Sequence, residues 1–432
     1  MISMTTARDL ALNVLQSLET GKEHSDTLLH RMLQRSTLKR VDRALSTALV
    51  NGVLRFRLQL DFIISHFYHH KLEKAAPVLK NILRIGVYQL LFLDKVPNWA
   101  AVNECVKLAR KYKGERLSKL VNGVLRNITP DNVALDEWLK EKTTAEQLAI
   151  RHSHPQWLVE RWLDAFGHEK TGSILLYNNQ FPLFGFRINR LKTSADQFFA
   201  SIDPPAEYEK CHLDNFFVSK EYSSFESAVT EGRLTVQNPA QALAALLLNP
   251  APGSIVLDLC AAPGGKTTFI GELMQNTGHI IAVDRYPQKL SDIETHAKAL
   301  GITIITTVAA DARSFQPDQQ PDAILLDAPC SGTGVLGRRA ELRWKLNPGM
   351  LEELRVLQAE LLDHAATLLD QEGVLVYATC SVEPEENSMQ IASFLQRHPD
   401  FTTDPEGGVL TLPGEHTGCD GGFCQRLKKI RD

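Results

Sequence analysis

The chain has 432 residues, about three times the length of a ~150-residue domain, so two or three domains are expected. Hydrophobic residues make up 44% and charged residues 23%, with 26 glycines and 20 prolines, which excludes collagen-like and wholly disordered classes. The 47 basic and 51 acidic residues give a net charge of −4, which by itself argues against a strongly basic nucleic-acid-binding protein.

The charge is unevenly distributed along the chain. Residues 1–128 contain 21 Lys and Arg against 10 Asp and Glu, which gives +11, and the remainder, with 26 against 41, carries −15. A basic segment joined to an acidic one is typical of a polyanion-binding module attached to a larger body. The alternative is a basic helical domain whose charges serve only solubility.

The cysteines and the N-terminal sequence indicate the compartment. Seven widely spaced cysteines, with no CxxC pair, argue against a disulfide framework and against a zinc site. The opening MISMTTARDL lacks the apolar segment of a signal peptide, and no apolar run is long enough to cross a bilayer. We therefore expect a cytoplasmic protein with reduced thiols, no membrane association and no metal.

Residues 1–145 are predicted to form an all-helical domain. Apolar residues recur at three- and four-residue spacing, for example at Leu83, Val87 and Leu90, and no strand pattern interrupts them before residue 128. Residues 146–235 combine short strand candidates at 184–189, 215–219 and 232–236 with short helical stretches, which predicts a small α/β domain.

Residues 236–432 show a regular alternation of apolar strands and helical stretches. This pattern is typical of a Rossmann-like, mostly parallel sheet with helices on both faces. In such sheets ligands bind beyond the carboxyl ends of the strands, so the residues there are the candidate site residues. The strand candidates are 255–259, 279–283, 302–308, 323–326 and 374–378.

A glycine-containing loop follows the first of these strands. The chain continues from Asp258 through Leu-Cys-Ala-Ala-Pro-Gly-Gly-Lys to Thr267. Its end matches the GK[ST] of a phosphate-binding P-loop, but Cys260 stands where the first glycine of that motif is required, and GxGxxG is absent. The loop therefore argues against a nucleoside triphosphate.

Acidic residues follow three further strands, at Asp284, Asp311 and Asp327. A carboxylate at the second strand end is placed to accept the hydroxyls of a ribose. Each acid alone is also a plausible helix cap. Three acids at strand ends beside a glycine loop favour a bound nucleoside.

Two cysteines, Cys330 and Cys380, follow the fourth and fifth strands. A single cysteine is most often a small buried hydrophobe, but two at neighbouring strand ends indicate covalent catalysis. The C5 carbon of a pyrimidine is too poor a nucleophile to take a methyl group unaided, and a thiolate that adds to C6 makes C5 reactive. Because a free thiol titrates near ~8.5, a cation such as Lys266 is expected to help ionise it.

These motifs carry a family resemblance over nearly the whole chain. The segments starting at Asp258, at Leu326 (Leu-Asp-Ala-Pro-Cys-Ser-Gly-Thr-Gly) and at Tyr377 (Tyr-Ala-Thr-Cys-Ser) resemble the NOL/NOP/Sun family of S-adenosylmethionine-dependent RNA (cytosine-5) methyltransferases. The segments starting at Ala101 (Ala-Val-Asn-Glu-Cys-Val) and Leu120 (Leu-Val-Asn-Gly-Val-Leu-Arg) resemble the RNA-binding NusB helical domain. The resemblance implies a NusB-like domain, a small α/β domain and a Rossmann-like methyltransferase domain.

The resemblance also implies ligands and roles. The cofactor is S-adenosylmethionine, and the substrate is a cytosine of 16S ribosomal RNA that is unassembled or partly assembled. Cys380 is implied as the nucleophile at C6, and Cys330 as the thiol that assists product release. Asp327 is implied to hold the cytosine, Asp284 the ribose hydroxyls and Asp311 the adenine edge. The implied cofactor-binding set comprises Cys260, Ala261, Ala262, Pro263, Gly264, Gly265 and Lys266, together with the same three aspartates.

Basic and aromatic residues that follow the Cys330 loop are predicted to contact RNA, the alternative being a solvated basic face. The sequence departs from the family pattern at Asn238, at Ala340-Glu341 and at Gly422, and we expect these departures to bear on RNA positioning more than on chemistry. The predicted RNA contacts are Arg338, Arg339, Arg343 and Trp344.

Other functions remain open from the sequence. The same chemistry on transfer RNA or on DNA is possible, as is an RNA-binding ribosome-assembly factor with a vestigial methyltransferase domain. DNA cytosine-5 enzymes use the cysteine of a Pro-Cys motif, which here is Cys330, so the Thr-Cys-Ser motif at Cys380 favours RNA. The intact pair of cysteines argues against a vestigial site. A base inside a helix must be extruded before a buried thiol can reach it.

Overall fold

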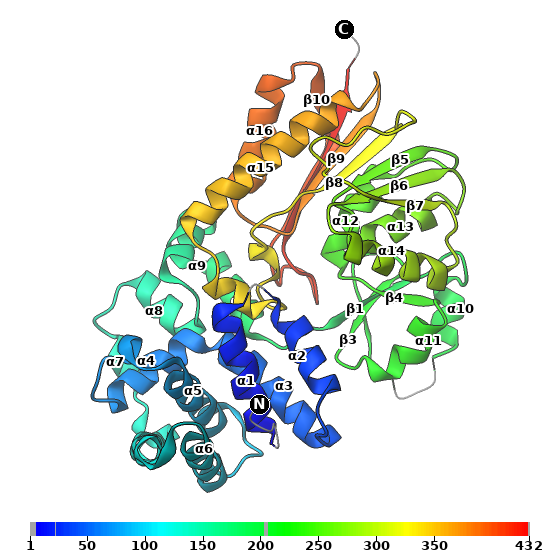
Figure 1. The fold of residues 1–432 in the computed structure, drawn as a ribbon. Coiled ribbons are helices and arrows are strands. Elements are labelled where there is room, and N and C mark those ends of the chain that lie inside the picture. Colours follow the sequence, from blue (N-terminus) through cyan, green and yellow to red (C-terminus); the bar gives the residue numbers. More distant parts are fainter. Residues whose placement is uncertain (1–5, 22, 203–205, 431–432) are drawn as a thin grey trace. The chain divides into compact units, whose positions relative to one another are not determined.

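The structure is a computed structural model of the chain, and it describes residues 6–21, 23–202 and 206–430. The chain forms two compact units, one made of Met1–Asn179 and Arg339–Lys345 and the other of Gln180–Arg338 and Leu346–Asp432. Figure 1 shows the elements of both units. The first predicted domain begins at residue 1, and its residues 1–5 lie outside the described part of the chain.

The first unit, called the helical unit below, is helical throughout its described residues, as predicted. Its helices are α1 (Ala7–Thr20), α2 (Ser25–Gln34), α3 (Arg40–Arg55), α4 (Arg57–Phe67), α5 (Pro77–Phe92), α6 (Asn98–Leu125), α7 (Leu135–Leu139), α8 (Thr144–His152) and α9 (Gln156–Asn179), with short 3-10 turns at Leu72–Lys74, Pro130–Asn132 and Ala340–Trp344. Because helices α8 and α9 also belong to this unit, it extends to Asn179. The sequence predicted an earlier start of the second domain, at residue 146.

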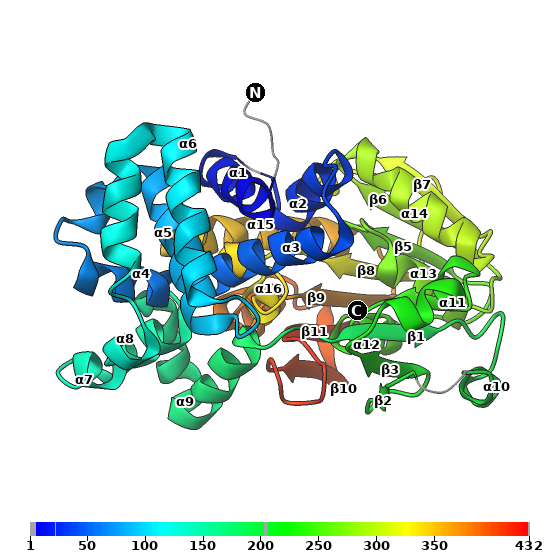
Figure 2. The same ribbon diagram turned by 90° about the horizontal axis from the view of Figure 1, so that it is seen from below.

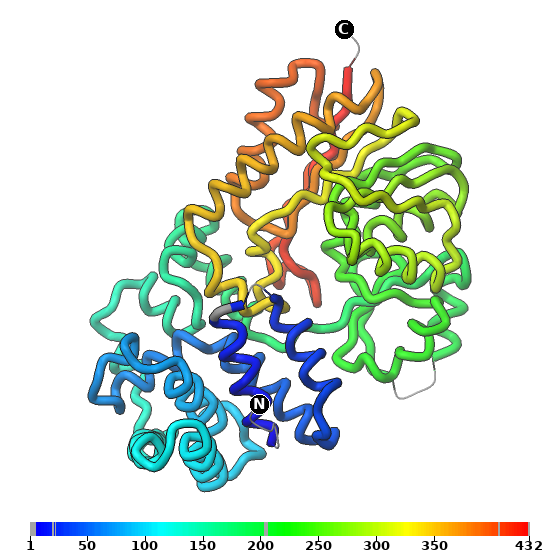
Figure 3. Tube along the Cα trace, viewed as in Figure 1, coloured from blue at the N-terminus to red at the C-terminus, as the bar shows by residue number. Residues whose placement is uncertain are grey.

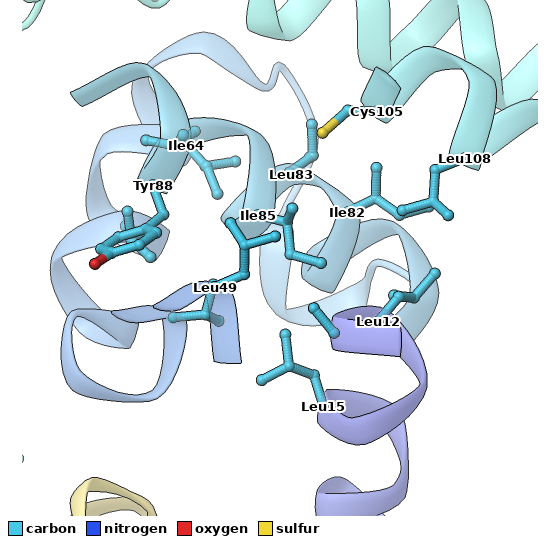
Figure 4. Packing of buried hydrophobic residues seen from close by; sticks show 14 of the residues in the cluster. Leu12, Leu15, Leu49, Ile64, Ile82, Leu83, Ile85, Tyr88, Cys105 and Leu108 are labelled. Atoms are coloured by element: carbon cyan, nitrogen blue, oxygen red, sulfur yellow. The ribbon is translucent and has the colours of Figure 1, made fainter. Parts of the chain in front are cut away.

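The core of the helical unit is built from apolar stripes at helical spacing. Figure 4 shows side chains from α1, α3, α4, α5 and α6 converging, and α5 is buried along most of its length. Burying one such side chain contributes about 1.5–3 kcal/mol. The residues labelled there are Leu12, Leu15, Leu49, Ile64, Ile82, Leu83, Ile85, Tyr88, Cys105 and Leu108, each less than 9% exposed.

Helix α6 consists of two halves joined by a bend at Gly114. Gly114 has φ +78°, a left-handed conformation that glycine adopts without steric cost. The bend turns the chain back, and Figure 2 shows the two halves of α6 side by side. Residues separated by a helix length in the sequence therefore face one another across this bend.

The second unit, called the α/β unit below, contains a small sheet and a large one. The small sheet is antiparallel in the order β2-β3-β1-β4 and packs phenylalanines such as Phe186 and Phe217 against α10 and α11. Its three longer strands match the predicted segments to within two residues. The elements are β1 (Phe184–Ile188), α10 (Ala195–Ala200), β2 (Glu209–Lys210), β3 (Phe216–Ser219), a 3-10 turn at Ser223–Phe225, α11 (Glu226–Thr230) and β4 (Leu234–Val236).

The large sheet has seven strands in the order β10-β11-β9-β8-β5-β6-β7. The five strands from β9 to β7 are parallel and match the five predicted strands, the third of them shifted to a later start. The antiparallel hairpin of β10 and β11 was not predicted, and the Cα trace in Figure 3 shows it near the C-terminus. The strands are β5 (Ile255–Leu259), β6 (His279–Asp284), β7 (Ile305–Ala309), β8 (Ala323–Asp327), β9 (Val374–Thr379), β10 (Phe401–Thr411) and β11 (Gly422–Lys429).

Helices cover both faces of the large sheet because successive strand residues point to opposite faces. Val256 and Leu325 pack against α12 and α13, whereas their neighbours Leu257 and Ile324 pack against α15 and α16. The strand order reverses between β5 and β8, the point at which such sheets bind ligands. The helices are α12 (Pro239–Leu248), α13 (Gly265–Leu273), α14 (Pro287–Leu300), α15 (Pro348–Thr367) and α16 (Ser388–Arg397). None of the helices in the described residues has the length and apolarity needed to cross a bilayer.

A buried ion pair fastens the small sheet to the large one within the α/β unit. Arg187 of β1 donates to the Glu272 carboxylate of α13 at 2.8 Å, and both side chains are fully buried. The guanidinium also donates to the carbonyl of Gly265, at the start of α13, at 3.0 Å. The contact thereby ties β1 to the helix that follows the glycine loop.

We predict that Glu272→Ala destabilises the α/β unit strongly. Removing one partner of a buried pair leaves an uncompensated charge and costs about 3–5 kcal/mol. The matched control is Glu360→Ala, which removes an exposed partner of Arg313, and an exposed ion pair contributes only about 0–1 kcal/mol. Thermal and urea unfolding measure both variants, and equal, small losses would contradict the role assigned to the buried pair.

Candidate active site

The carboxyl ends of β5, β6, β8 and β9 bring most of the predicted site residues to one edge of the large sheet. Asp284 and Asp327 are the last residues of β6 and β8, and Asp327 pairs in register with Ala378 of β9. Cys380 follows β9 directly, and Cys330 follows β8 by three residues. The edge therefore gathers two thiols and several carboxylates from strands that are far apart in the sequence.

The loop between β5 and α13 is shaped by two residues in the left-handed conformation. Cys260 has φ +64° and Gly264 has φ +97°. A Cβ atom at Gly264 would lie 3.0 Å from the Ile293 side chain, so only glycine fits without displacement. The buried Asp258 accepts a hydrogen bond from Thr267 Oγ1 at 2.6 Å, which fixes the first turn of α13 to the end of β5. Burial raises the pKa of Asp258 to about 7.

Asp284 and Asp311 differ in their surroundings. Asp284 is 8% exposed and accepts hydrogen bonds from the backbone N–H groups of Tyr286 at 2.9 Å and of Ala262, in the loop, at 3.3 Å. Asp311 is more exposed and pairs with Arg313 at 2.7 Å, and the hydrogen bonds from Arg313 lower the pKa of Asp311 to about 2. Asp284 thus lies against the loop, whereas the Asp311 carboxylate is already engaged by Arg313.

Lys266 forms an ion pair at the centre of the site. Its Nζ lies 2.7 Å from Asp327 Oδ2 and donates to Gln241 Oε1 at the same distance. Burial alone would lower the pKa of Lys266, but the charge of Asp327 outweighs it, and Cys380 adds to the increase, so the pKa is raised. Lys266 therefore stays charged, and its charge acts on both Asp327 and Cys380.

Cys330 and Cys380, the thiol pair, are in direct contact. Their Sγ atoms are 3.1 Å apart, both cysteines are free, and the backbone N–H of Cys380 donates to Cys330 Sγ at 3.3 Å. The hydrogen bond with Cys380, together with burial, raises the pKa of Cys330 well above its usual value. Cys330 therefore holds its proton more strongly than a free thiol and is placed to donate it to Cys380.

A buried carboxylate that the sequence analysis did not single out connects the two cysteine loops. Glu386, fully buried, accepts hydrogen bonds from Ser331, the neighbour of Cys330, through both its N–H at 2.9 Å and its hydroxyl. It also accepts from the hydroxyl of Ser381, the neighbour of Cys380. Gln358 of α15 donates to the same carboxylate at 2.9 Å. We call Glu386 with Ser331, Ser381 and Gln358 the carboxylate clamp.

The available sequence signal for the clamp was weak. Glu386 belongs to the run Glu383-Pro-Glu-Glu386, six residues beyond Cys380, and such a run ordinarily indicates a solvated turn. Here the run forms a 3-10 turn that directs Glu386 inward. Gln241, the partner of Lys266, was also missed, because nothing in the sequence links it to the loop.

Two of the predicted RNA contacts, Arg343 and Trp344, have side chains that are engaged inside the helical unit. Arg343 is fully buried, and its guanidinium donates to Asn179 Oδ1 at 2.8 Å and to the carbonyl of Arg55 at 3.0 Å. Trp344 is half-buried and donates from its indole to the carbonyl of Leu54 at 2.7 Å. Both residues hold the segment Arg339–Lys345 in that unit.

The other two predicted RNA contacts lie in different environments. Arg338, in the α/β unit, pairs through Nε with Asp420 and donates from a terminal nitrogen to the carbonyl of Leu183 at 2.7 Å, so two of its donors are engaged within this unit. Arg339 is exposed, and its contact with RNA stays a prediction.

The three departures from the family pattern have structural roles. Asn238 caps α12 by accepting from the N–H of Ala240 at 3.0 Å, so the helix contact is retained without an acidic residue. Glu341 is buried and accepts from the hydroxyl of Ser25 at 2.8 Å within the helical unit. Gly422 begins β11, where an added Cβ would lie 3.0 Å from the carbonyl of Thr379.

The described residues contain no group of three or more His, Cys, Asp or Glu side chains suited to a metal ion.

Three family models match the chain in succession. They are the NusB family over residues 5–130, the ferredoxin-like domain of RsmF/B-like methyltransferases over residues 154–203, and the 16S rRNA methyltransferase RsmB/F over residues 245–410.

Named relatives match over nearly their full length. The ribosomal RNA small subunit methyltransferase B of Shigella sonnei is 36% identical, over 99% of this chain and all of the relative. The probable ribosomal RNA small subunit methyltransferase B of Synechocystis sp. is also 36% identical, with the same coverage. The crystal structure of PH0851 is similar with a TM-score of 0.80 and 27% identity, over 98% of both chains. The chain therefore belongs to the RsmB/F family of 16S rRNA methyltransferases.

Proposed function

We propose that the protein methylates C5 of a cytosine in 16S ribosomal RNA, with S-adenosylmethionine as methyl donor. It would act in the cytoplasm on RNA that is unassembled or partly assembled. The observation that carries the proposal is the thiol pair, with Cys330 Sγ and Cys380 Sγ 3.1 Å apart beside the ion pair of Lys266 and Asp327. Covalent activation of a pyrimidine and its later release call for two such groups. The names of the relatives, which are methyltransferases of small subunit ribosomal RNA, and the matching family model, described as a 16S rRNA methyltransferase, support 16S rRNA as the substrate.

Cys380 is proposed as the nucleophile. Its sulfur forms a bond to C6, and the electron pair of the C5–C6 double bond moves so that C5 attacks the methyl group. The C5 proton then passes to Cys330 as Cys330 gives its own proton to the departing sulfur of Cys380. The bond between Cys380 Sγ and C6 breaks, and the aromatic ring and both thiols are restored. The nearby charge of Lys266 favours the ionised form of Cys380. Cys330, in contact with Cys380, lies beside the bond that must break last.

Asp327 is proposed to orient the cytosine. Its Oδ2 is held by Lys266 at 2.7 Å, which fixes the carboxylate next to the end of β9 and Cys380. A carboxylate in this position accepts hydrogen bonds from the amino group of cytosine and from a protonated N3. Gln241 holds Lys266 from the other side, so the position of Asp327 depends on both residues.

The loop at Cys260 fits S-adenosylmethionine in charge and backbone shape. The cofactor carries two positive groups, a sulfonium and an ammonium. Burial is the largest cause of the raised pKa of the Cys260 thiol, and the negative charges of nearby aspartates raise this pKa further. The electrostatic potential in the loop is therefore negative, which suits the positive groups of the cofactor. Gly264 places the backbone at the start of α13 with no side chain in the way. Asp284, at the end of β6, is placed for the ribose hydroxyls, and when bound the cofactor supplies an electrophilic methyl group. The aspartates concerned are Asp327, Asp284, Asp258 and Asp311.

We predict transfer of a radioactive methyl group from S-adenosylmethionine to C5 of cytosine in deproteinised 16S RNA, read out by nucleoside analysis. Transfer RNA and single-stranded DNA serve as the competing substrates. Label on transfer RNA or DNA in preference to 16S RNA would contradict the proposed substrate. Absence of label on all three would contradict the activity and favour an assembly factor with a vestigial domain.

We predict that the two thiols give opposite covalent phenotypes. Cys380→Ala should abolish methyl transfer and form no adduct, because no bond to C6 can form. Cys330→Ala should stop turnover after methyl transfer and leave a protein–RNA adduct that survives denaturing electrophoresis. An adduct formed by Cys380→Ala instead would reverse the assigned roles.

We predict that Glu386→Gln impairs catalysis by changing the thiol pair and not RNA affinity. An amide is a poorer acceptor for the clamp hydroxyls, so kcat should fall roughly 10- to 100-fold, equivalent to about 1.4–2.7 kcal/mol, with KM nearly unchanged. The charge of Glu386 also contributes, after Cys380 and burial, to the raised pKa of Cys330. Alkylation of Cys330, followed by peptide mass spectrometry, should therefore shift to lower pH.

The control for this prediction is Glu352→Gln, which removes an exposed carboxylate of α15 that pairs with Arg355. It should leave kcat and both alkylation profiles as in the wild type. If Glu386→Gln lowers thermal stability but leaves kcat and the alkylation profile of Cys330 unchanged, the clamp has only a structural role.

A further inference from the structure

The bend in α6 creates a groove that the proposed chemistry does not use. Residues from both halves of the helix line it, together with Leu90 of α5 and the segment that follows α6, and its volume is about 640 Å³. This volume lies within the ~300–1,000 Å³ typical of sites for small molecules or single nucleotides. We call it the α6 groove.

The two NusB-like motifs of the sequence meet in this groove. Asn103 comes from the motif that starts at Ala101, and Asn122 comes from the motif that starts at Leu120. Neither side-chain amide has a hydrogen-bond partner among the described residues. Asparagine is a poor helix former, so two of them on facing helical stripes are not explained by helix propensity. Both amides are left available to a ligand as donors and acceptors.

An exposed aromatic ring stands at the same groove. Trp99 lies in the first turn of α6 and lines the groove. Its side chain is 73% exposed. Its indole makes no ring contact with another described residue. A flat aromatic face beside amide groups is the arrangement with which proteins stack unpaired bases.

The charge of the groove is positive. Its titratable side chains are three cations and one carboxylate, a net charge of +2. Arg110 is neutralised by Glu115, with the nearest atoms at 2.7 Å. Lys119 and Arg126 have no ion-pair partner in the described part of the chain. The groove therefore complements an anion that carries flat, hydrogen-bonding groups.

We propose that the α6 groove binds an unpaired segment of RNA. A base stacks on Trp99, the amides of Asn103 and Asn122 contact base edges, and Lys119 and Arg126 contact phosphates. The inference rests on the proposed function in one respect, since the RNA bound here is part of the same substrate. It places a second contact on the helical unit, apart from the thiol pair.

The test measures the affinity of the full-length protein for a fluorescein-labelled, unstructured RNA dodecamer at several salt concentrations and without cofactor. Trp99→Ala should weaken binding about tenfold, the typical loss of one stacked base, and Trp99→Phe should retain most of the affinity because it keeps a ring. Lys119→Ala and Arg126→Ala should each lower the slope of log affinity against log salt by about 0.7. Lys74→Ala, an exposed lysine outside the groove, is the control and should change neither quantity.

A duplex of the same sequence should compete poorly, and equal competition by the duplex would overturn the preference for unpaired RNA. Wild-type affinity in Trp99→Ala, Lys119→Ala and Arg126→Ala would overturn the proposal, even if the protein methylates RNA. Groove-dependent binding by a protein that transfers no methyl group would support the proposal and contradict only the proposed function. Thermal unfolding of each variant separates loss of binding from loss of folding.

Discussion

The geometry of the reactive site depends on one buried carboxylate. Glu386 accepts hydrogen bonds from residues adjacent to each of the two cysteines, so the loops after β8 and β9 share a single anchor. A hydrogen bond to a charged group contributes about 1.5–3 kcal/mol, and leaving one unmade in a buried site costs a comparable amount. Neither loop can move away from the other without breaking its hydrogen bond to Glu386. The short distance between the two sulfur atoms follows from this arrangement.

Other parts of the chain use buried polar groups in the same way. Asp258 fastens α13 to β5 through Thr267, and Arg187 fastens β1 to α13 through Glu272. Each contact fixes a loop or a helix start where apolar packing alone gives little directional control. Buried ion pairs are weak sources of net stability, but breaking one of them is costly. Their effect here is to fix positions at the edge of the sheet where the ligands are proposed to bind.

The sequence predicted the parallel strands and the helical unit well, because both carry strong local patterns. Strands buried on both faces read as continuous apolar runs, and the helices repeat their apolar residues at regular spacing. The β10–β11 hairpin was missed because its strands contain polar residues such as Thr402, Gln425 and Lys428 and show no continuous run.

The site was predicted less evenly than the fold. The cysteines and aspartates could be singled out as candidate site residues because they follow recognisable strands within specific motifs. The buried position of Arg343 depends on carbonyl groups from Arg55 and Asn178, which are 288 and 165 residues away along the chain. An arginine in a basic run reads as solvated, and no local pattern reveals such distant acceptors. Glu386 escaped notice for the same reason.

The place of the segment Arg339–Lys345 in the helical unit limits how this protein can have been assembled from modules. The chain crosses between the two units at residues 179, 338 and 345, so the helical unit is not a simple N-terminal appendage. A gene that lost the first 179 residues would expose Arg343 and Ala340, which are buried against helices encoded there. Conversely, a helical domain made of residues 1–179 alone would lack the segment Arg339–Lys345, which belongs to this unit and contributes Ala340 to its core. Exchange of either unit alone would therefore leave buried groups uncovered.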